Sequence, residues 1–262
     1  MARFAPLFSG SSGNSTFFGS ATEGILIDAG KNAKQLTLAL DRIGVDPGSL
    51  RGVFVTHEHS DHIAGLRVFA SRYGLPVYAT RGTLNYLEKH GHLDSVGRAE
   101  LLPAEGVSFD TMKISAFRTS HDAAESVGYR VEFADGRVAA LATDTGIATQ
   151  EVLQGVRGAD LTLLESNHDV RMLRNGPYPY HLQQRILSRL GHLSNTDCAA
   201  VAVWLLERGT TRFVLGHLSK QNNTPEEARR VTLAALTGEG GAEGEDFLLS
   251  VASPDGGEMT VF

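Results

Sequence analysis

Short apolar runs that each lead to a histidine or an aspartate recur along this chain of 262 residues. The clearest, residues 52–56, is followed at once by His-Glu-His-Ser-Asp-His at positions 57–62. Short apolar runs bounded by glycine and polar residues are typical of buried strands. Four further runs lead to Asp28, His121, Asp144 and His217. Side chains at successive strand ends can converge on one edge of a sheet, so the pattern predicts a strand-rich fold with a polar site at that edge.

Segment 57–62 carries the residue types of a metal site. Imidazole and carboxylate ligands suit zinc and neighbouring divalent ions. His57 and His59 alternate in an extended turn and can point at one ion, while Asp61 and His62 can serve a second. Two ions roughly 3.5–4 Å apart are a device of hydrolytic enzymes. The alternative, a histidine-rich surface loop without function, leaves the other strand-end residues unexplained.

In their order along the chain, these residues resemble the five motifs of the metallo-β-lactamase superfamily. The matching positions are Asp28, His57, His59, Asp61, His62, His121, Asp144 and His217. Further segments resemble the YycJ (WalJ) branch of metal-dependent nucleases that act on DNA. These segments are Ser9–Ser15, Glu165–Asp169, Asn175–His181, Gly191–Asn195 and Gly216–Asn223. The resemblance extends from about residue 5 to the C-terminus.

Strands and helices in mixed order predict an α/β or α+β fold. Apolar spacing, caps and terminal glycines predict four helices. They are Asn32–Ile43, His62–Tyr73, Ser194 or Asn195 to Arg208, and Thr224 to near Leu236. Asp135-Gly136 between two apolar runs predicts a β-hairpin. The resemblance implies a four-layer αββα sandwich, and the short spacing of the later motifs favours one domain over residues 1–262.

The resemblance also implies two divalent ions, either zinc or manganese, with a nucleophilic water between them. The first ion would take His57, His59 and His121, the second Asp61, His62 and His217, and Asp144 would bridge both. Asp61 is also counted among the catalytic residues. Asp28 is expected to orient the histidine loop through hydrogen bonds without ligating a metal itself.

Three residues outside this ligand set are candidates for a general acid. Glu165 ends the apolar run 161–164, His168 follows three residues later, and His192 lies between two turns rich in glycine and serine. In tRNA-processing relatives, a glutamate and a histidine at comparable points are thought to protonate the leaving oxygen. Glu165 and His192 are expected to do so here, because a carboxylate holds a histidine near physiological pKa. The structural alternative is that Glu165 caps a strand and His192 packs in a turn.

Substrate contacts are expected from the loop 9–15, whose backbone N–H groups and hydroxyls can face an anion as in glycine-rich nests. The stretch 167–192 carries four arginines against one aspartate. It is either a phosphate-contacting patch or a solvated helix face. The expected contacts are Ser9, Ser11, Ser12, Asn14, Arg171, Arg174, Arg185, Lys220 and Asn222.

Composition narrows the functional classes. A formal net charge of −6 argues against a protein that coats DNA generally, so nucleic-acid binding would be local. No signal peptide and no stretch of roughly 20 apolar residues is evident, which predicts a cytoplasmic protein that does not bind membranes. The single cysteine, Cys198, excludes an intrachain disulfide and is expected in the core.

The favoured function is therefore a metal-dependent phosphodiesterase acting on nucleic acid. The branch resemblance implies a DNA exonuclease working 5′→3′, with endonuclease activity left open. A small-ester hydrolase (a thioesterase, lactonase or cyclic-nucleotide phosphodiesterase) is the alternative, because the fold does not settle the substrate. A non-enzymatic protein that keeps metals for stability is a third class. The sequence leaves the metal, the DNA or RNA preference and the oligomeric state open.

Overall fold

The computed structural model describes residues 1–262, and its strands form two mixed seven-stranded sheets. The first has the order β14 (Thr260–Val261), β1 (Arg3–Phe8), β2 (Ser15–Gly19), β3 (Gly24–Ile27), β4 (Leu50–Phe54), β5 (Val77–Ala79) and β6 (Ala99–Leu101). The second has the order β13 (Leu248–Val251), β12 (Arg212–Gly216), β11 (Leu161–Glu165), β10 (Val138–Ala142), β9 (Val127–Phe133), β8 (Met112–Arg118) and β7 (Val107–Ser108). Strands β3 to β6 are parallel in the first sheet, as are β10 to β13 in the second.

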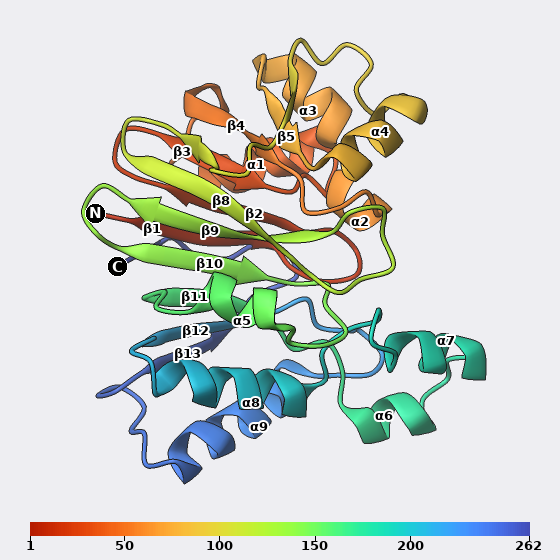
Figure 1. Ribbon diagram of the computed structural model, residues 1–262, viewed down its shortest axis with the longest axis vertical. Coiled ribbons are helices and arrows are strands. Elements are labelled where there is room, and N and C mark those ends of the chain that lie inside the picture. Colours follow the sequence, from red (N-terminus) through yellow and green to blue (C-terminus); the bar gives the residue numbers. More distant parts are fainter.

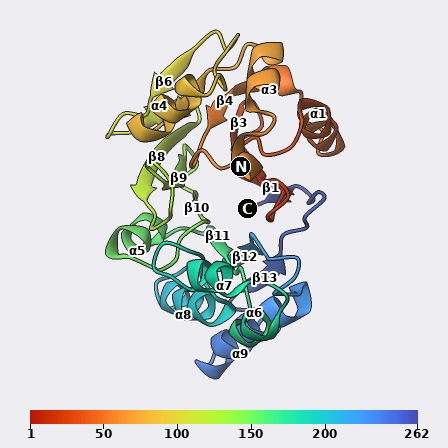
Figure 2. The same ribbon diagram turned by 90° about the vertical axis from the view of Figure 1, so that its right-hand side faces the viewer.

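The sheets pack face to face, and helices cover both outer faces (Figure 1 and Figure 2). Helices α1 (Ala33–Arg42), α3 (Leu66–Tyr73) and α4 (Arg81–Lys89) cover the first sheet. Helices α5 (Gln150–Val156), α8 (Asn195–Leu206) and α9 (Pro225–Gly238) cover the second. A short 3-10 turn, η1 (Pro47–Ser49), precedes β4, and α2 (Ser60–Ile63) follows it. The four-layer αββα sandwich is confirmed.

The core between the sheets fixes the strand that leads into the histidine loop. Phe54, at the end of β4, is fully buried and stacks on Tyr78 with ring centroids 4.6 Å apart. Tyr129 of β9 meets Phe54 edge to face at 5.7 Å, and its hydroxyl donates to the carbonyl of Val55 at 2.7 Å. A buried phenol needs such a partner. The second sheet therefore holds the first at the point where the chain enters segment 57–62.

The capping signals in the sequence were reliable. Asn32, Ser194 and Thr224 each accept a hydrogen bond from a backbone N–H of the first turn, at the starts of α1, α8 and α9. The Asp135-Gly136 hairpin is confirmed, since β9 and β10 pair antiparallel around it. Cys198 is fully buried in the core, as expected.

The helix predicted over 62–73 is wrong in one respect, because the structure divides this region into α2 and α3. Gly65 lies at the break, and its N–H donates to the carbonyl of Ala29 at 2.9 Å. A Cβ at Gly65 would collide with the carbonyl of Lys31. The chain therefore turns where its backbone packs against the loop after β3, and a glycine is required for that close approach.

Between β11 and α8 the chain leaves the sandwich and forms two short helices, α6 (Val170–Asn175) and α7 (Tyr180–Ile186). Figure 1 shows them projecting beyond the sheets at the lower right. None of the helices in residues 1–262 combines the length and the apolar character needed to cross a membrane.

Candidate metal centre

Three strand ends carry their polar residue in a left-handed backbone conformation. Asp28 follows β3 with φ of 63°, Asp144 lies just after β10 with φ of 55°, and His217 follows β12 with φ of 55°. Such angles are uncommon for residues other than glycine, and strained backbone concentrates at functional sites. Only Ser95 shares this conformation among the non-glycine residues. The strain therefore marks the edge of the sandwich where both sheets end.

The seven residues predicted as metal ligands lie together at this edge. The potential ligand atoms of His57, His59 and His121 lie within 4.8 Å of one another, and so do those of Asp61, His62 and His217. The two groups come from both sheets: the 57–62 loop follows β4, His121 follows β8 and His217 follows β12.

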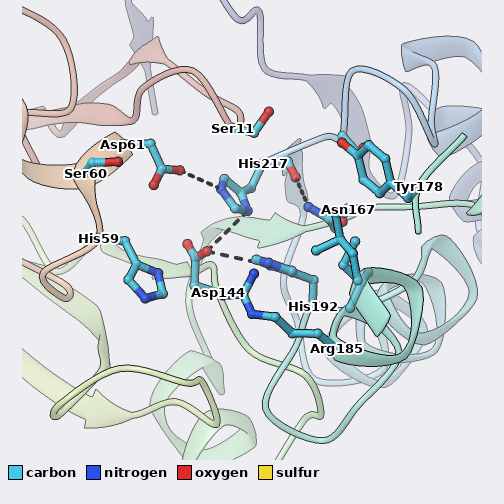
Figure 3. A pocket seen from close by; sticks show the side chains of 13 residues that line it. Ser11, His59, Ser60, Asp61, Asp144, Asn167, Tyr178, Arg185, His192 and His217 are labelled. Carbon is cyan, nitrogen blue, oxygen red and sulfur yellow. Dashed lines mark hydrogen bonds and ion pairs between the residues drawn. The ribbon is translucent and has the colours of Figure 1, made fainter. Parts of the chain in front are cut away.

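Asp144 lies between the two groups (Figure 3). Its Oδ2 is 3.3 Å from Nε2 of His62, and its Oδ1 is 3.8 Å from Nε2 of His121 and 3.4 Å from Nδ1 of His217. A carboxylate in this position can contact both groups of ligand atoms.

Three potential ligand atoms in this cluster are buried without a hydrogen-bond partner. They are Nε2 of His57, Oδ2 of Asp144 and Nε2 of His217. A buried polar atom without a partner is costly, and cations bound in the cluster would give these atoms partners. Burial and the neighbouring His62 and His121 also lower the pKa of His57 well below its usual range, which keeps it in the neutral form that binds metal. The cluster therefore fits a bound cation.

A network behind the ligands fixes their orientation. Asp28 accepts hydrogen bonds from the backbone N–H and the hydroxyl of Thr56, both at 2.8 Å, and lies 2.7 Å from Nδ1 of His62. The Thr56 hydroxyl is also 3.0 Å from Nδ1 of His57. Both rings are thereby held at Nδ1 and present Nε2 toward the cluster. Burial lowers the pKa of His62, but the carboxylates of Asp144 and Asp28 outweigh it and raise the pKa to about 9, so the site favours positive charge.

Glu165 organises the other side of the cluster. Its Oε1 lies 2.7 Å from Nδ1 of His192 and 2.9 Å from Nδ1 of His217. Its Oε2 accepts from the backbone N–H groups of Thr145 and Leu193. Burial raises the pKa of Glu165, but the charges and hydrogen bonds of His192 and His217 outweigh it and lower the pKa, so the group stays a carboxylate. Glu165 thus orients His192, as predicted, and also orients His217, which the sequence did not indicate.

His192 and His168 differ in their access to the site. His192 lines the cavity, and because Nδ1 is paired with Glu165, Nε2 is the nitrogen left for a substrate. His168 is 1% exposed, does not line the cavity, and has no hydrogen bond at either ring nitrogen. Burial lowers its pKa to about 4, so it is neutral at physiological pH. The geometry favours His192 over His168 as the proton donor.

The cluster forms the floor of a cavity of about 350 Å³ (Figure 3). Of the seven residues, His59, Asp61, Asp144 and His217 line the cavity, and the other three do not. Its lining also includes serines, one asparagine, one arginine and three apolar residues. The full lining is Ser11, His59, Ser60, Asp61, Asp144, Asn167, Tyr178, Leu182, Arg185, Ile186, His192, His217 and Ser219.

The residues predicted in the N-terminal loop have different positions. Ser11 lines the cavity, and Ser12 is exposed beside it, where it accepts from Nζ of Lys31 at 3.1 Å. Ser9 is buried and accepts from the backbone N–H of His217 at 2.8 Å. Asn14 is buried, with Nδ2 3.2 Å from Oδ2 of Asp61 and 3.1 Å from Nε2 of His62. Ser9 and Asn14 therefore support the ligand loops from behind.

The remaining predicted contacts also separate into two groups. Arg185 lines the cavity, whereas Arg171, Arg174 and Lys220 are exposed and do not. Asn222 is fully buried, and its carbonyl accepts from the backbone N–H of Asp169 at 2.9 Å. Only Arg185 of this group is placed to meet a substrate at the floor.

Several residues of the site were not anticipated. Asn167 donates from Nδ2 to the carbonyl of His217 at 2.9 Å and lines the cavity. Glu58 turns away from the ligands and accepts from the backbone N–H of Ala124, which fixes the loop that carries His121. The sequence could have indicated Thr56 as a site residue, because it joins the strand to the histidine loop. The cavity residues Tyr178 and Ser219 lie in segments that resemble the nuclease branch, but no role was predicted for them from the sequence. Leu182 and Ile186 had no comparable signal.

Comparison with known proteins agrees with this geometry. Residues 24–218 match a family model described as a β-lactamase superfamily domain. The exodeoxyribonuclease WalJ of Streptococcus pneumoniae serotype 2 is 39% identical over 97% of this chain and 95% of its own length. The exodeoxyribonuclease YycJ of Bacillus anthracis is 36% identical over 96% of this chain and 95% of its own.

Among solved structures, zinc-bound PqqB from Methylobacterium extorquens superposes with a TM-score of 0.73 at 17% identity, over 99% of this chain and 100% of its own. At that identity the likeness concerns the fold alone. The family match and the full-length relatives go further, and they agree with the strand-end ligand pattern: the chain belongs to the metallo-β-lactamase superfamily and, within it, to the WalJ/YycJ family.

Proposed function

We propose that this protein is a dinuclear metal-dependent phosphodiesterase that removes nucleotides from DNA ends. The observation that carries the proposal is the clustering of seven ligand-type residues at one cavity. Four of them line the cavity together with His192, and Glu165 holds that histidine from behind. The full-length relatives are named exodeoxyribonucleases, which supports DNA as the substrate.

Two ions would be held as the two groups of ligand atoms suggest. His57, His59 and His121 would hold one ion, Asp61, His62 and His217 the other, and Asp144 would contact both. Zinc and manganese both accept such a set of imidazoles and carboxylates. The bound ions would supply Lewis acidity toward the scissile phosphate and activate water for attack.

The protein's own proton donor would be His192. Glu165 holds its Nδ1, which leaves Nε2 to meet a leaving oxygen in the cavity that His192 lines. Glu165 also stabilises the protonated ring before transfer, because the carboxylate lies 2.7 Å away. His192 would give its proton to the departing 3′ or 5′ oxygen and recover one from solvent.

The surroundings of the cavity favour a strand end over the middle of a duplex. The only added structure near the floor is the short α6–α7 segment, and the sandwich offers no large clamp for a duplex. A single strand can lead its end past Ser11 and Arg185 to the floor. We expect 5′→3′ polarity, as the resemblance implies.

A closed circular single-stranded DNA and its linear form test the proposal directly. With manganese or zinc present, the linear strand should be degraded and the circle should resist. Equal cutting of both would refute the dependence on ends. Strands labelled at the 5′ or the 3′ end would give the polarity.

The competing activity is hydrolysis of a small ester. A panel of thioesters, lactones and cyclic nucleotides should show no turnover comparable to that of linear DNA. If the metal-loaded protein cut no DNA or RNA but hydrolysed a member of the panel, the small-ester alternative would replace the nuclease proposal. Asp144→Asn in parallel shows whether any activity comes from this site.

A further inference from the structure

The polar cavity has one apolar wall, and a single short segment supplies all of it. Tyr178, Leu182 and Ile186 are the only apolar residues among the thirteen that line the cavity. Leu182 and Ile186 are four residues apart on α7, so they share one helix face. Figure 3 places Tyr178 on the opposite side of the labelled residues from His59.

The backbone at Tyr178 is restrained. Pro177 and Pro179 flank it, and a residue before proline is restricted to extended backbone. The carbonyl of Tyr178 accepts from Nε2 of Gln183 at 2.9 Å. A Cβ on Gly176 would collide with Oδ1 of Asn222, so this turn packs closely on the loop after β12. Because the backbone that carries the ring is already fixed, only the side-chain torsions of Tyr178 must be ordered when a ligand contacts it.

We propose that Tyr178 stacks on the base of the nucleotide whose phosphate lies at the metal centre, with Leu182 and Ile186 completing an apolar base site. The proposal rests on the nuclease function proposed above. Within a nucleotide, the phosphate needs the polar floor, and only the base offers a flat apolar face to the wall. Every base has such a face, so aromatic stacking tolerates any sequence.

The base site has a consequence for substrate choice. A base that lies on Tyr178 cannot at the same time remain stacked in a duplex, so the nucleotide must be unpaired before cleavage. The enzyme would therefore select single-stranded or frayed ends through the apolar wall. The metal centre at the floor would not distinguish them from paired ends. Arg185 belongs to the same helix and lines the same cavity; its Nε and Nη2 bind Asp122, which leaves Nη1 for the phosphate.

The test combines a change in the enzyme with removal of the base. One substrate is a linear single-stranded oligonucleotide, and the other has tetrahydrofuran residues, which lack a base, at both ends. The wild type should cleave the terminal bond of the base-bearing strand roughly 10- to 100-fold faster in kcat/KM, the usual size of one base–aromatic stack. Tyr178→Ala should reduce this preference to nearly one, because it slows only the base-bearing reaction by that factor.

Three further variants separate stacking from bulk and folding. Tyr178→Phe should keep the preference, since the ring remains. Tyr178→Leu keeps an apolar side chain without a ring and should lose most of the preference. If Tyr178→Ala does not fold, Tyr178→Leu tests the stacking in its place. Tyr180 is 75% exposed and does not line the cavity, so Tyr180→Ala is the matched control and should behave as the wild type.

The possible results distinguish the two proposals. If the wild type cleaves both strands equally, or if Tyr178→Ala and Tyr178→Leu slow both by the same factor, the base site is refuted and the nuclease function stands. If the wild type cleaves neither strand with manganese or zinc present, the nuclease function fails and the base site with it. Loss of the preference in Tyr178→Ala and Tyr178→Leu but not in Tyr178→Phe or Tyr180→Ala supports the base site.

Discussion

The floor and the wall of the cavity are built in different ways. The floor residues His57, His62 and Asp144 are almost completely buried, and they come from strand ends of both sheets. The wall residues Tyr178, Leu182 and Ile186 come from one segment outside the sandwich, and Arg185 of the same helix lies beside them. Of these four, only Ile186 is buried. The floor is fixed by both sheets, whereas the wall belongs to a segment outside the sandwich that packs on the loop after β12. This arrangement assigns the chemistry to the floor and the choice of substrate to the wall.

Replacing Asp144 tests the floor most severely and should have the largest effect. Asp144→Asn removes charge from the residue that faces both groups of ligand atoms. Loss of metal-based stabilisation, worth several kcal/mol, should reduce hydrolysis by roughly 10³-fold or more. Elemental analysis of the purified variant should find less bound metal. Asp41→Asn, at an exposed position on α1, is the control and should keep both metal and activity. Full metal content and activity in Asp144→Asn would contradict the assignment.

His192 lies where the floor meets the wall, and its removal should separate metal binding from proton transfer. His192→Ala should keep the metals but slow cleavage of a native phosphodiester by roughly 10²–10⁴-fold, the usual contribution of a general acid. A substrate with a p-nitrophenolate leaving group needs no proton on departure and should recover much of the loss. His181→Ala, an exposed histidine on α7, should have no such effect. A wild-type rate of His192→Ala on DNA would exclude the role.

Thr56 tests the support of the floor without touching a proposed ligand. Thr56→Val keeps the shape but removes the hydroxyl that meets Asp28, His57 and His62. Changes in such supporting partners typically cost 10- to 100-fold in metal affinity, and we expect a loss of roughly that size in a zinc titration. Thr162 offers a matched control, because it is equally buried and its hydroxyl has no partner. Equal metal affinities of Thr56→Val and Thr162→Val would show that the network does not act on the metals.

The sequence predicted the floor well because its signals are local. An apolar run followed at once by a polar residue fixes both a strand and the edge at which its side chain emerges, as at Asp28 and His217. Caps at Ser194 and Thr224 are equally local, since the cap and its backbone partner are three residues apart. The contact of Glu165 with His217 is different. It depends on the register of two parallel strands, in which Glu165 lies beside Gly216, and no local signal contains that register.

The wall was harder to predict because it depends on the path of one turn. From the sequence, the arginine-rich stretch was equally compatible with a phosphate-contacting patch and with a solvated helix face. The structure contains arginines of both kinds. Arg171 and Arg174 on α6 are exposed outside the cavity, whereas Arg185 on α7 lines it. The turn at 176–179 separates the two helices, and its direction depends on contact with Asn222, which is distant in sequence. Asn14 shows the same dependence, because its contacts with Asp61 and His62 bridge two loops.

The wall is tested by a smaller effect, the salt dependence of DNA binding. Arg185 uses Nε and Nη2 to bind Asp122, at 2.5 Å and 2.9 Å, and retains Nη1 for a phosphate. Arg185→Ala should weaken binding of single-stranded DNA several-fold and reduce the slope of log K against log salt by about 0.7, the value for one phosphate on a single strand.

Arg208→Ala is the control, because Arg208 is paired with Glu207 and does not line the cavity. This variant should leave the slope unchanged. A change in Arg174→Ala as well would extend the path of the strand along α6.

Arg185→Ala also leaves Asp122 without its partner, and that carboxylate could repel DNA by itself. Asp122→Asn, alone and combined with Arg185→Ala, separates the two causes through a double-mutant cycle. If Arg185→Ala no longer weakens binding or lowers the slope in the Asp122→Asn background, repulsion by Asp122 explains the effect and Arg185 does not contact phosphate. If the loss persists there, Arg185 binds the strand directly, and the wall contributes affinity as well as selectivity.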